Sequence, residues 1–422
     1  MKKIKKLLCA FLVCLLALGL VACAGDNTPE DSNTGEVDNQ ESTDSGSDTG
    51  DNGNNGVTDD GIIKLDADAT FLKLLDERQQ FSSTGITCDW SCAGIEFTAE
   101  CEGDITIGVL VDSSTGCYFR AYVDNTEWKN GDTPYYECLS GTAEIVLKDI
   151  PNGTHTIRIV KATGYTLART TLVSLKFENG TPSTTAPADK EMFIEYIGDS
   201  IFCGWGVVQT PWGAYNGTYQ SQDGTLAIPY LVSNEFNADY SVVAVSGQGV
   251  VRGDPNIENA YKYASYDRDK TTEYGFERKA DVVVVNVGTN DYAKKDSISA
   301  DEFATAYKRM LEYVRAKNGD DCIILVTYNM MNDGYGSRVE EVISQLGGVE
   351  ENYYIVKSER CSAVNSTHPS AEENVAYAKV ISDTIKAIMD GSYIAPNKTE
   401  MLIGTGASLA EADIPSTPWK EN

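Results

Sequence analysis

The chain has 422 residues and a formal net charge of −29 at pH 7, from 63 acidic and 34 basic side chains. At roughly 100–200 residues per domain, this length predicts two folded domains with additional segments. Proteins that bind nucleic acid neutralise its phosphates with basic side chains, and a net charge this negative disfavours such binding. We therefore expect no nucleic-acid partner.

Residues 1–23 have the pattern of an export signal. A lysine-rich start precedes a short apolar run from Leu7 to Val21, which is too short to span a membrane. Leu20-Val21-Ala22-Cys23 matches a bacterial lipobox, which implies cleavage before Cys23 and lipid attachment to its thiol. We therefore expect a lipoprotein on the extracellular face of the bacterial cell membrane, either anchored through Cys23 or released. Ordinary secretion with an incidental cysteine is the alternative.

Residues 24–61 are predicted to be a disordered acidic linker. They are mostly Gly, Ser, Thr, Asn, Asp and Glu, with eleven acidic side chains and no basic one. Such a segment cannot bury a core, and its like charges keep it extended.

The cysteines do not indicate a metal site. Of the eleven, Cys9 and Cys14 leave with the signal and Cys23 is the lipid site. The other eight include no Cys-x-x-Cys pair, so we expect no zinc ribbon and no redox motif. A disulfide such as Cys88–Cys92 and free thiols both remain open.

Residues 62–180 show the pattern of short β-strands. Apolar and polar residues alternate over 94–99 and 105–111, and turn residues such as Pro151-Asn152-Gly153 separate further runs. This spacing predicts a β-sandwich domain of jelly-roll type. Five aromatic side chains here could form a sugar-binding platform or pack in the core and between domains: Trp90, Tyr122, Trp128, Tyr135 and Tyr136.

Residues 190–396 alternate between strand and helix patterns, after a linker that ends near residue 188. Five apolar runs predict buried parallel strands, at 192–197, 241–245, 282–287, 323–327 and 353–356. Amphipathic helices begin at two capping boxes, Ser299 with Glu302 and Ser370 with Glu373. We therefore predict a three-layer α/β domain with a parallel sheet. The tail, residues 397–422, has no assignable role.

Gly198-Asp199-Ser200 directly follows the first of these strands. That position predicts Ser200 at a strand-to-helix turn, where free N–H groups favour a developing anion. A serine hydroxyl becomes a good nucleophile when an adjacent base takes its proton. Alone, Ser200 could equally be a helix N-cap.

Two further turns follow the second and third strands. Asn290, in Gly288-Thr289-Asn290-Asp291, can present its amide N–H to an oxyanion. Gly247, in Ser246-Gly247-Gln248-Gly249, lets its backbone N–H approach a ligand closely, although Gly249 is a rival for that role. Each motif alone is an ordinary turn.

His368 is the candidate base. The chain holds two histidines, and His155 falls in the β-sandwich, where we expect it at the surface. His368 follows the last strand, and Pro369 restricts it to extended backbone. Because ligands gather at the carboxyl ends of parallel strands, we expect Ser200 and His368 to meet there.

The order Ser200, Gly247, Asn290, His368 on this topology resembles the SGNH (GDSL-like) hydrolases over residues 190–392. With the preceding β-sandwich, the chain from residue 62 is similar to carbohydrate esterase family 2. The resemblance implies a flavodoxin-like catalytic domain with Ser200 as nucleophile and His368 as base. It implies oxyanion donation by the Ser200 N–H, Gly247 and Asn290. It further implies an acetylxylan-esterase-like enzyme that removes O-acetyl groups from polysaccharide or oligosaccharide, with no metal and no organic cofactor.

One residue departs from the superfamily pattern. Many of these enzymes carry an acid three residues before the histidine, and here that residue is Asn365. An amide can orient the imidazole but carries no charge to stabilise the imidazolium. The family 2 resemblance implies a Ser–His dyad instead, with a backbone carbonyl holding the histidine.

Substrate contacts are predicted around the nucleophile. Trp205 and Trp212 follow it and could stack on sugar rings, although core packing is the commoner use of Trp. Asp199 and Asp291 are also assigned to substrate binding.

The prediction is a surface-anchored serine esterase that acts on polysaccharide of the xylan or mannan type. Its oligomeric state is left open, with a monomer favoured. One rival is a lipase, thioesterase or peptidoglycan O-acetylesterase on the same scaffold. The other is a non-catalytic carbohydrate-binding lipoprotein that retains a decayed esterase domain.

Overall fold

The computed structural model describes residues 61–208, 218–362 and 368–395. The predicted signal with Cys23, the linker up to residue 60, Trp212, Asn365 and the tail lie outside these residues, so the predictions made for them stay predictions. Among the described helices, none has the length and apolar character needed to cross a membrane.

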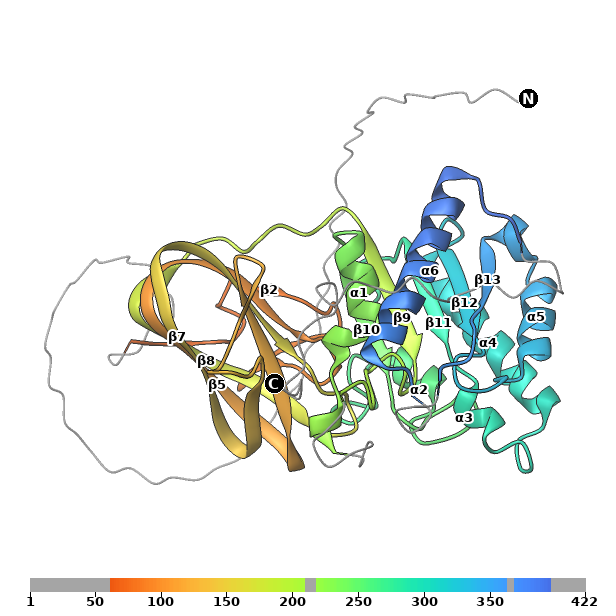
Figure 1. Cartoon of the computed structure of the whole chain (residues 1–422), viewed down its shortest axis with the longest axis horizontal. Helices are drawn as coiled ribbons and strands as arrows, with labels where there is room; N and C mark the ends of the chain where they lie inside the picture. Colours follow the sequence, from red (N-terminus) through yellow and green to blue (C-terminus); the bar gives the residue numbers. More distant parts are fainter. Residues whose placement is uncertain (1–60, 209–217, 363–367, 396–422) are drawn as a thin grey trace, which may run out of the picture. The chain divides into compact units, whose positions relative to one another are not determined.

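The first part, here called the β region (residues 62–182), is built of antiparallel strands joined through β5 and β8. The long strands β5, β7 and β8 are strongly curved in Figure 1. An antiparallel β architecture is therefore present, and its jelly-roll topology stays a prediction. The strands are β1 Ile62–Lys64, β2 Lys73–Leu74, β3 Phe81–Ser82, β4 Gly85–Thr87, β5 Gly94–Val123, β6 Thr126–Trp128, β7 Tyr136–Lys161 and β8 Arg169–Pro182.

The strands of the β region are longer than the sequence pattern predicts. Strand β5 runs through both predicted runs, 94–99 and 105–111, without a break. Pro151-Asn152-Gly153, predicted as a turn, lies inside β7, and the pairing register shifts just after Cys101 on the facing strand. An extra residue at such a bulge bends a strand without ending it. As a result, Ile159 pairs with both Ile95 and Ala121, which lie near opposite ends of β5.

The second part, here called the α/β region (residues 193–390), contains a sheet of five parallel strands in the order β10-β9-β11-β12-β13. Every residue of β9, β10 and β11 is buried, as expected for a parallel sheet covered on both faces. All five strands lie within two residues of the predicted runs. They are β9 Phe193–Gly198, β10 Asp239–Ala244, β11 Val282–Asn286, β12 Ile323–Tyr328 and β13 Tyr353–Lys357.

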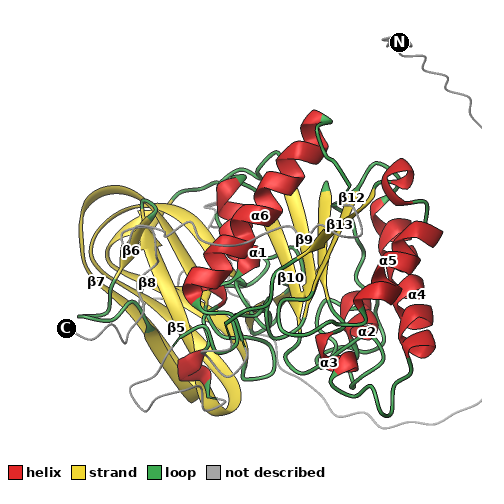
Figure 2. Ribbon diagram, turned by 45° about the vertical axis from the view of Figure 1, so that its right-hand side comes forward, coloured by secondary structure: helices red, strands yellow, loops and turns green. Residues whose placement is uncertain are grey.

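Helices cover both faces of this sheet. In Figure 2, α1 and α6 lie on one face while α4 and α5 lie on the other. The helices are α1 Ile228–Glu235, α2 Ile257–Lys262, α3 Thr289–Tyr292, α4 Ala300–Asn318, α5 Gly336–Gln345 and α6 Ala371–Asp390, with short 3-10 segments η1 Tyr219–Ser221, η2 Gly224–Leu226 and η3 Gly348–Glu351. Ser299 and Ser370 both cap their helices, because each accepts the backbone N–H three residues on. The predicted capping box is confirmed in full at Ser370 with Glu373, and at Ser299 the cap bond to the Glu302 N–H is present.

A segment of the β region covers the edge of the parallel sheet. Asp76 forms a parallel bridge with Tyr240 of the edge strand β10, and its carboxylate accepts the Val242 N–H at 2.9 Å. Two residues on, the buried Arg78 pairs with Glu195 of β9 at 3.1 Å. The edge strand thus gains backbone and side-chain partners from the other part of the chain, which protects it from pairing with another molecule.

Aromatic residues of the β region are used for packing. Trp90 is 1% exposed, stacks on Tyr165, and donates its indole N–H to the Ala264 carbonyl at 2.7 Å. Tyr135 and Tyr136 are also buried. These three side chains therefore serve the interior and the contact between the two regions, and they cannot form the sugar platform considered from the sequence.

Candidate active site

The structure brings Ser200 and His368 together at the carboxyl edge of the parallel sheet. Ser200 follows β9 and His368 precedes α6, and the Ser200 Oγ lies 2.9 Å from the His368 Nε2. Ser200 is 4% exposed and His368 is partly exposed. At this distance a neutral imidazole can accept the hydroxyl proton, which is the geometry that nucleophilic catalysis requires. The other histidine, His155, lies in β7 with its side chain 14% exposed and contacting Asp124, so it is less exposed than predicted.

The segment after Ser200 differs from the prediction. Up to residue 208 it forms hydrogen-bonded turns and no helix, with the Trp205 N–H bound to the Ser200 carbonyl at 2.9 Å. A helix dipole therefore does not supply the predicted stabilisation of an anion at Ser200 within these residues. The individual N–H groups of the turn remain as donors.

Two backbone N–H groups are available as oxyanion donors. Within the described parts of the chain, neither the Ser200 N–H nor the Gly247 N–H has a hydrogen-bond acceptor. Gly247 has a φ of +81°, a backbone conformation that favours glycine. The N–H of its rival Gly249 donates to the Arg252 carbonyl at 2.9 Å, so the geometry favours Gly247.

Asn290 lies on the single-turn helix α3, directly after β11. Its amide Nδ2 donates to the Asp199 carboxylate at 3.1 Å and to the Gln248 carbonyl at 2.9 Å. Both amide hydrogens therefore have acceptors in the ligand-free protein. To stabilise an oxyanion, Asn290 must share or release one of them, and the Asp199 bond is the longer.

Asp199 is fully buried directly beside the nucleophile. Burial raises the pKa of its carboxyl group to about 7, and the nearby Asp291 adds to the increase, while the Ile201 N–H lowers it. Because Asp199 has no exposed surface and accepts the Asn290 amide, its role in this geometry is to orient Asn290. Its predicted part as a substrate contact has no support in this geometry.

Asp291 is likewise fully buried and holds the loop that carries Gly247. Its two carboxylate oxygens accept the backbone N–H groups of Val250, Val251 and Arg252, each at 2.9 Å. A Cβ added to Gly249 would lie 2.2 Å from the Asp291 Oδ2, which explains the glycine at that position. Asp291 is therefore placed to shape the oxyanion loop, and the structure does not place it against a substrate.

Trp205 is partly buried and packs against the apolar core that includes Tyr196 and Phe202. This agrees with the commoner use of Trp, and Trp212 lies outside the described residues.

The eight cysteines of the described residues are free thiols, seven of them buried. In the same residues no three His, Cys, Asp or Glu side chains are grouped to hold a metal ion.

The part of the chain that carries the site is similar to a known family of hydrolases. Residues 196–379 match the model of the GDSL-like Lipase/Acylhydrolase family, a span that contains Ser200, Gly247, Asn290 and His368. The resemblance to GDSL-like hydrolases predicted from the sequence is thereby confirmed.

The chain is also similar to individual esterases of known bacteria. The chain is 28% identical over 289 residues to a cellulase/esterase of Acetivibrio thermocellus, covering 64% of this chain and 33% of that protein. It is 23% identical over 260 residues to an acetylxylan esterase / glucomannan deacetylase of Cellvibrio japonicus, covering 57% and 71%. The chain thus spans about a third of the length of the cellulase/esterase it matches.

Solved structures share the fold across both regions. A family two carbohydrate esterase from Clostridium thermocellum, in complex with cellohexaose, superposes with a TM-score of 0.67 at 24% identity, covering 76% of this chain and 99% of that one. A family two carbohydrate esterase from Cellvibrio japonicus gives 0.68 at 18% identity, covering 78% and 98%. The predicted likeness to carbohydrate esterase family 2 is thus confirmed in the fold.

One contributor to the site was missed in the sequence. Gln248 accepts the Asn290 amide through its backbone carbonyl. A backbone group carries no residue-type signal, so its position between Gly247 and Gly249 was the one available clue.

Proposed function

We propose that this protein is a cell-surface esterase that removes O-acetyl groups from polysaccharide of the xylan or mannan type. The observation that carries the proposal is the 2.9 Å contact between the Ser200 Oγ and the His368 Nε2, beside two N–H groups without acceptors in the described residues. The relatives named as acetylxylan esterases and glucomannan deacetylase support an esterase and a polysaccharide substrate.

The reaction proceeds through an acyl-enzyme. His368 takes the Ser200 proton as the Oγ attacks the acetyl carbonyl, and the C–O bond to the sugar breaks after a tetrahedral intermediate forms. The Ser200 and Gly247 N–H groups stabilise the oxyanion, joined by Asn290 when it exchanges one of its two acceptors. His368 then protonates the departing sugar oxygen, and water repeats the sequence to release acetate.

The lipobox at Cys23 supports a place on the extracellular face of the membrane. A lipid anchor of this kind would hold the enzyme where extracellular polysaccharide is met. Labelling with a radioactive fatty acid tests this: label in the wild type that the Cys23→Ala variant loses supports anchoring through Cys23, and an unlabelled wild type contradicts it.

The substrate is tested by acetate release from acetylated xylan, acetylated glucomannan and O-acetylated murein. We expect release from at least one of the two plant-type polysaccharides at a rate well above that from murein, and no release by the Ser200→Ala variant. Preference for murein, or for octanoyl over acetyl esters, would assign the site to one of the rival hydrolases. Polysaccharide binding without acetate release would favour the non-catalytic alternative.

A further inference from the structure

A cavity of about 370 Å³ lies between the β region and the α/β region. The β region contributes residues 112–114 and 165–169 to its lining, and the α/β region contributes Gln248, Asp254 and Asp267 among others. A volume in this range is typical of small-molecule sites and accommodates a sugar residue.

The cavity adjoins the candidate active site through Gln248. Gln248, which lines it, follows Gly247 in the chain and accepts the Asn290 amide. On the other side, Gly164 precedes the lining residue Tyr165 and packs so closely on Cys203 that an added Cβ would lie 3.1 Å from the Cys203 Cβ. A polymer held at Ser200 could therefore extend into this cavity.

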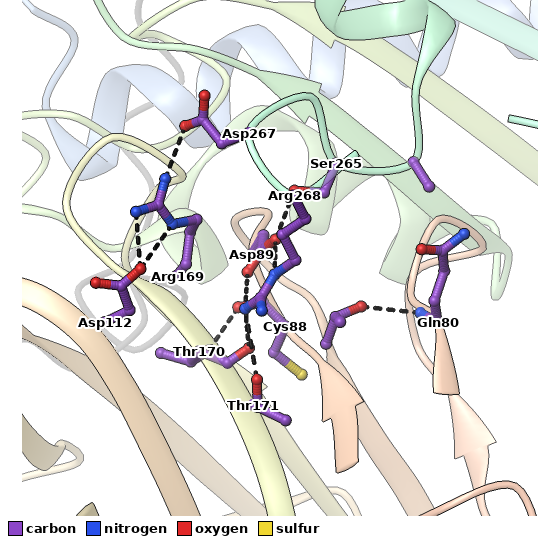
Figure 3. A network of polar contacts seen from close by, with 12 residues as sticks. Gln80, Cys88, Asp89, Asp112, Arg169, Thr170, Thr171, Ser265, Asp267 and Arg268 are labelled. Carbon is purple, nitrogen blue, oxygen red and sulfur yellow. Dashed lines mark hydrogen bonds and ion pairs between the residues drawn. The ribbon is translucent and has the colours of Figure 1, made fainter. Parts of the chain in front are cut away.

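The lining is rich in hydrogen-bond acceptors. Arg169 lies between two carboxylates, 2.7 Å from Asp112 and 3.0 Å from Asp267, as Figure 3 shows. Asp254 accepts the hydroxyl of Tyr266 at 2.8 Å. Asp112 and Asp254 each keep one carboxylate oxygen with no hydrogen-bond partner among the described residues. Three carboxylates against one guanidinium leave the cavity negatively charged.

The walls are fixed by a second ion pair nearby. Arg268 binds the 2% exposed Asp89 with two hydrogen bonds, of 2.6 and 2.7 Å, and donates to the Thr170 carbonyl at 3.1 Å (Figure 3). Thr170 and Arg268 directly follow Arg169 and Asp267 in the chain. The two sides of the cavity are therefore held in place before a ligand arrives, which lowers the entropy cost of binding.

We propose that this cavity is a subsite for an uncharged sugar residue of the polysaccharide, next to the residue that is deacetylated. Sugar hydroxyls would donate to the carboxylates of Asp112, Asp254 and Asp267, as charge-assisted hydrogen bonds. The excess of carboxylates repels a uronate or another anionic sugar. This subsite rests on the proposed function for its place in catalysis, but its sugar binding can be measured without turnover.

The test uses calorimetric titration of the full chain carrying Ser200→Ala, with xylohexaose, mannohexaose and a glucuronate-substituted xylo-oligosaccharide as probes. We expect a neutral hexasaccharide to bind more tightly than the glucuronate form. Adding Asp112→Asn and Asp267→Asn should weaken that binding roughly tenfold, because neutral amides replace charged acceptors. Glu144→Gln, an exposed change on β7 outside the cavity, is the matched control and should leave affinity unchanged.

Binding of neither neutral hexasaccharide, tighter binding of the glucuronate form, or equal affinity with and without the two aspartates would overturn the subsite. Nitrophenyl acetate turnover, measured with Ser200 restored, keeps the two proposals separate. The control Glu144→Gln should leave this turnover unchanged, since Glu144 lies outside both the cavity and the candidate active site. A wild-type protein without ester turnover would refute the esterase, while the titrations would still decide the subsite.

Discussion

Ser200 and His368 are 168 positions apart in the chain, yet their reactive atoms lie at hydrogen-bond distance. Sequence reasoning could bring them together because each follows a strand of the same parallel sheet, and such strands end at one edge. It assigned Asp199 and Asp291 to the substrate because burial is not visible in a motif. Both are fully buried, and their oxygens bind the protein's own N–H groups.

The buried Asp199 predicts a specific pH dependence of stability. Its pKa is raised from 3.8 to about 7 in the folded protein, so folding takes up a proton between these values. This group therefore makes the folded state less stable as pH rises from about 4 to 7, by an amount on the order of 4 kcal/mol. Asp199→Asn should remove that loss.

The measurement is urea unfolding of the wild type and Asp199→Asn at pH 4, 5.5 and 7. Asp76, whose pKa burial raises to about 6, acts in the same direction in both proteins, so the difference between the curves isolates Asp199. Equal loss of stability in both proteins between pH 4 and 7 would show that Asp199 ionises normally.

At the scale of elements, the α/β region was the more predictable part. Its strands are continuous apolar runs, and its two longest helices, α4 and α6, carry N-caps, so local patterns define these elements. In the β region, β5 continues through bulges where the sequence indicated turns, because tertiary pairing decides whether a bend ends a strand. The turn after β9 was expected to begin a helix. Within the described residues it forms only turns, and the sequence pattern did not indicate this.

A prediction at the scale of elements concerns the loop after β10, which carries Gly247 and is held by Asp291. Asp291→Asn replaces one of two accepting oxygens with an N–H₂ group, so at least one of the three loop N–H groups loses its acceptor. We expect a stability loss of about 1–3 kcal/mol, together with a fall in kcat of roughly tenfold or more as Gly247 shifts.

Asn256→Ala is the matched control. Asn256 caps α2 at the end of the same loop and accepts the Asn259 N–H at 2.9 Å. Its loss should cost about 1 kcal/mol of stability without changing kcat. Wild-type kcat in a destabilised Asp291→Asn protein would show that the loop does not position the oxyanion donor.

For the whole molecule, the contact between the two regions could not be read from the sequence. Trp90 and Arg78 offered no local pattern that set packing apart from ligand binding, and each is buried against partners more than 100 positions away. The sequence predicted two domains and a site at the carboxyl ends of the parallel strands, but it did not predict how the two domains contact each other. The cavity between the regions depends on how they meet, and that required the structure.

The central claim is that Ser200, activated by His368, is the nucleophile. The most direct measurement is nitrophenyl acetate hydrolysis by the full chain and by its Ser200→Ala variant, with unfolding curves to show that both are folded. We predict measurable turnover in the wild type and a loss of at least about 10³-fold in the variant, because removing the nucleophile removes the acyl-enzyme route. A folded variant that keeps more than a few per cent of the activity would contradict the claim.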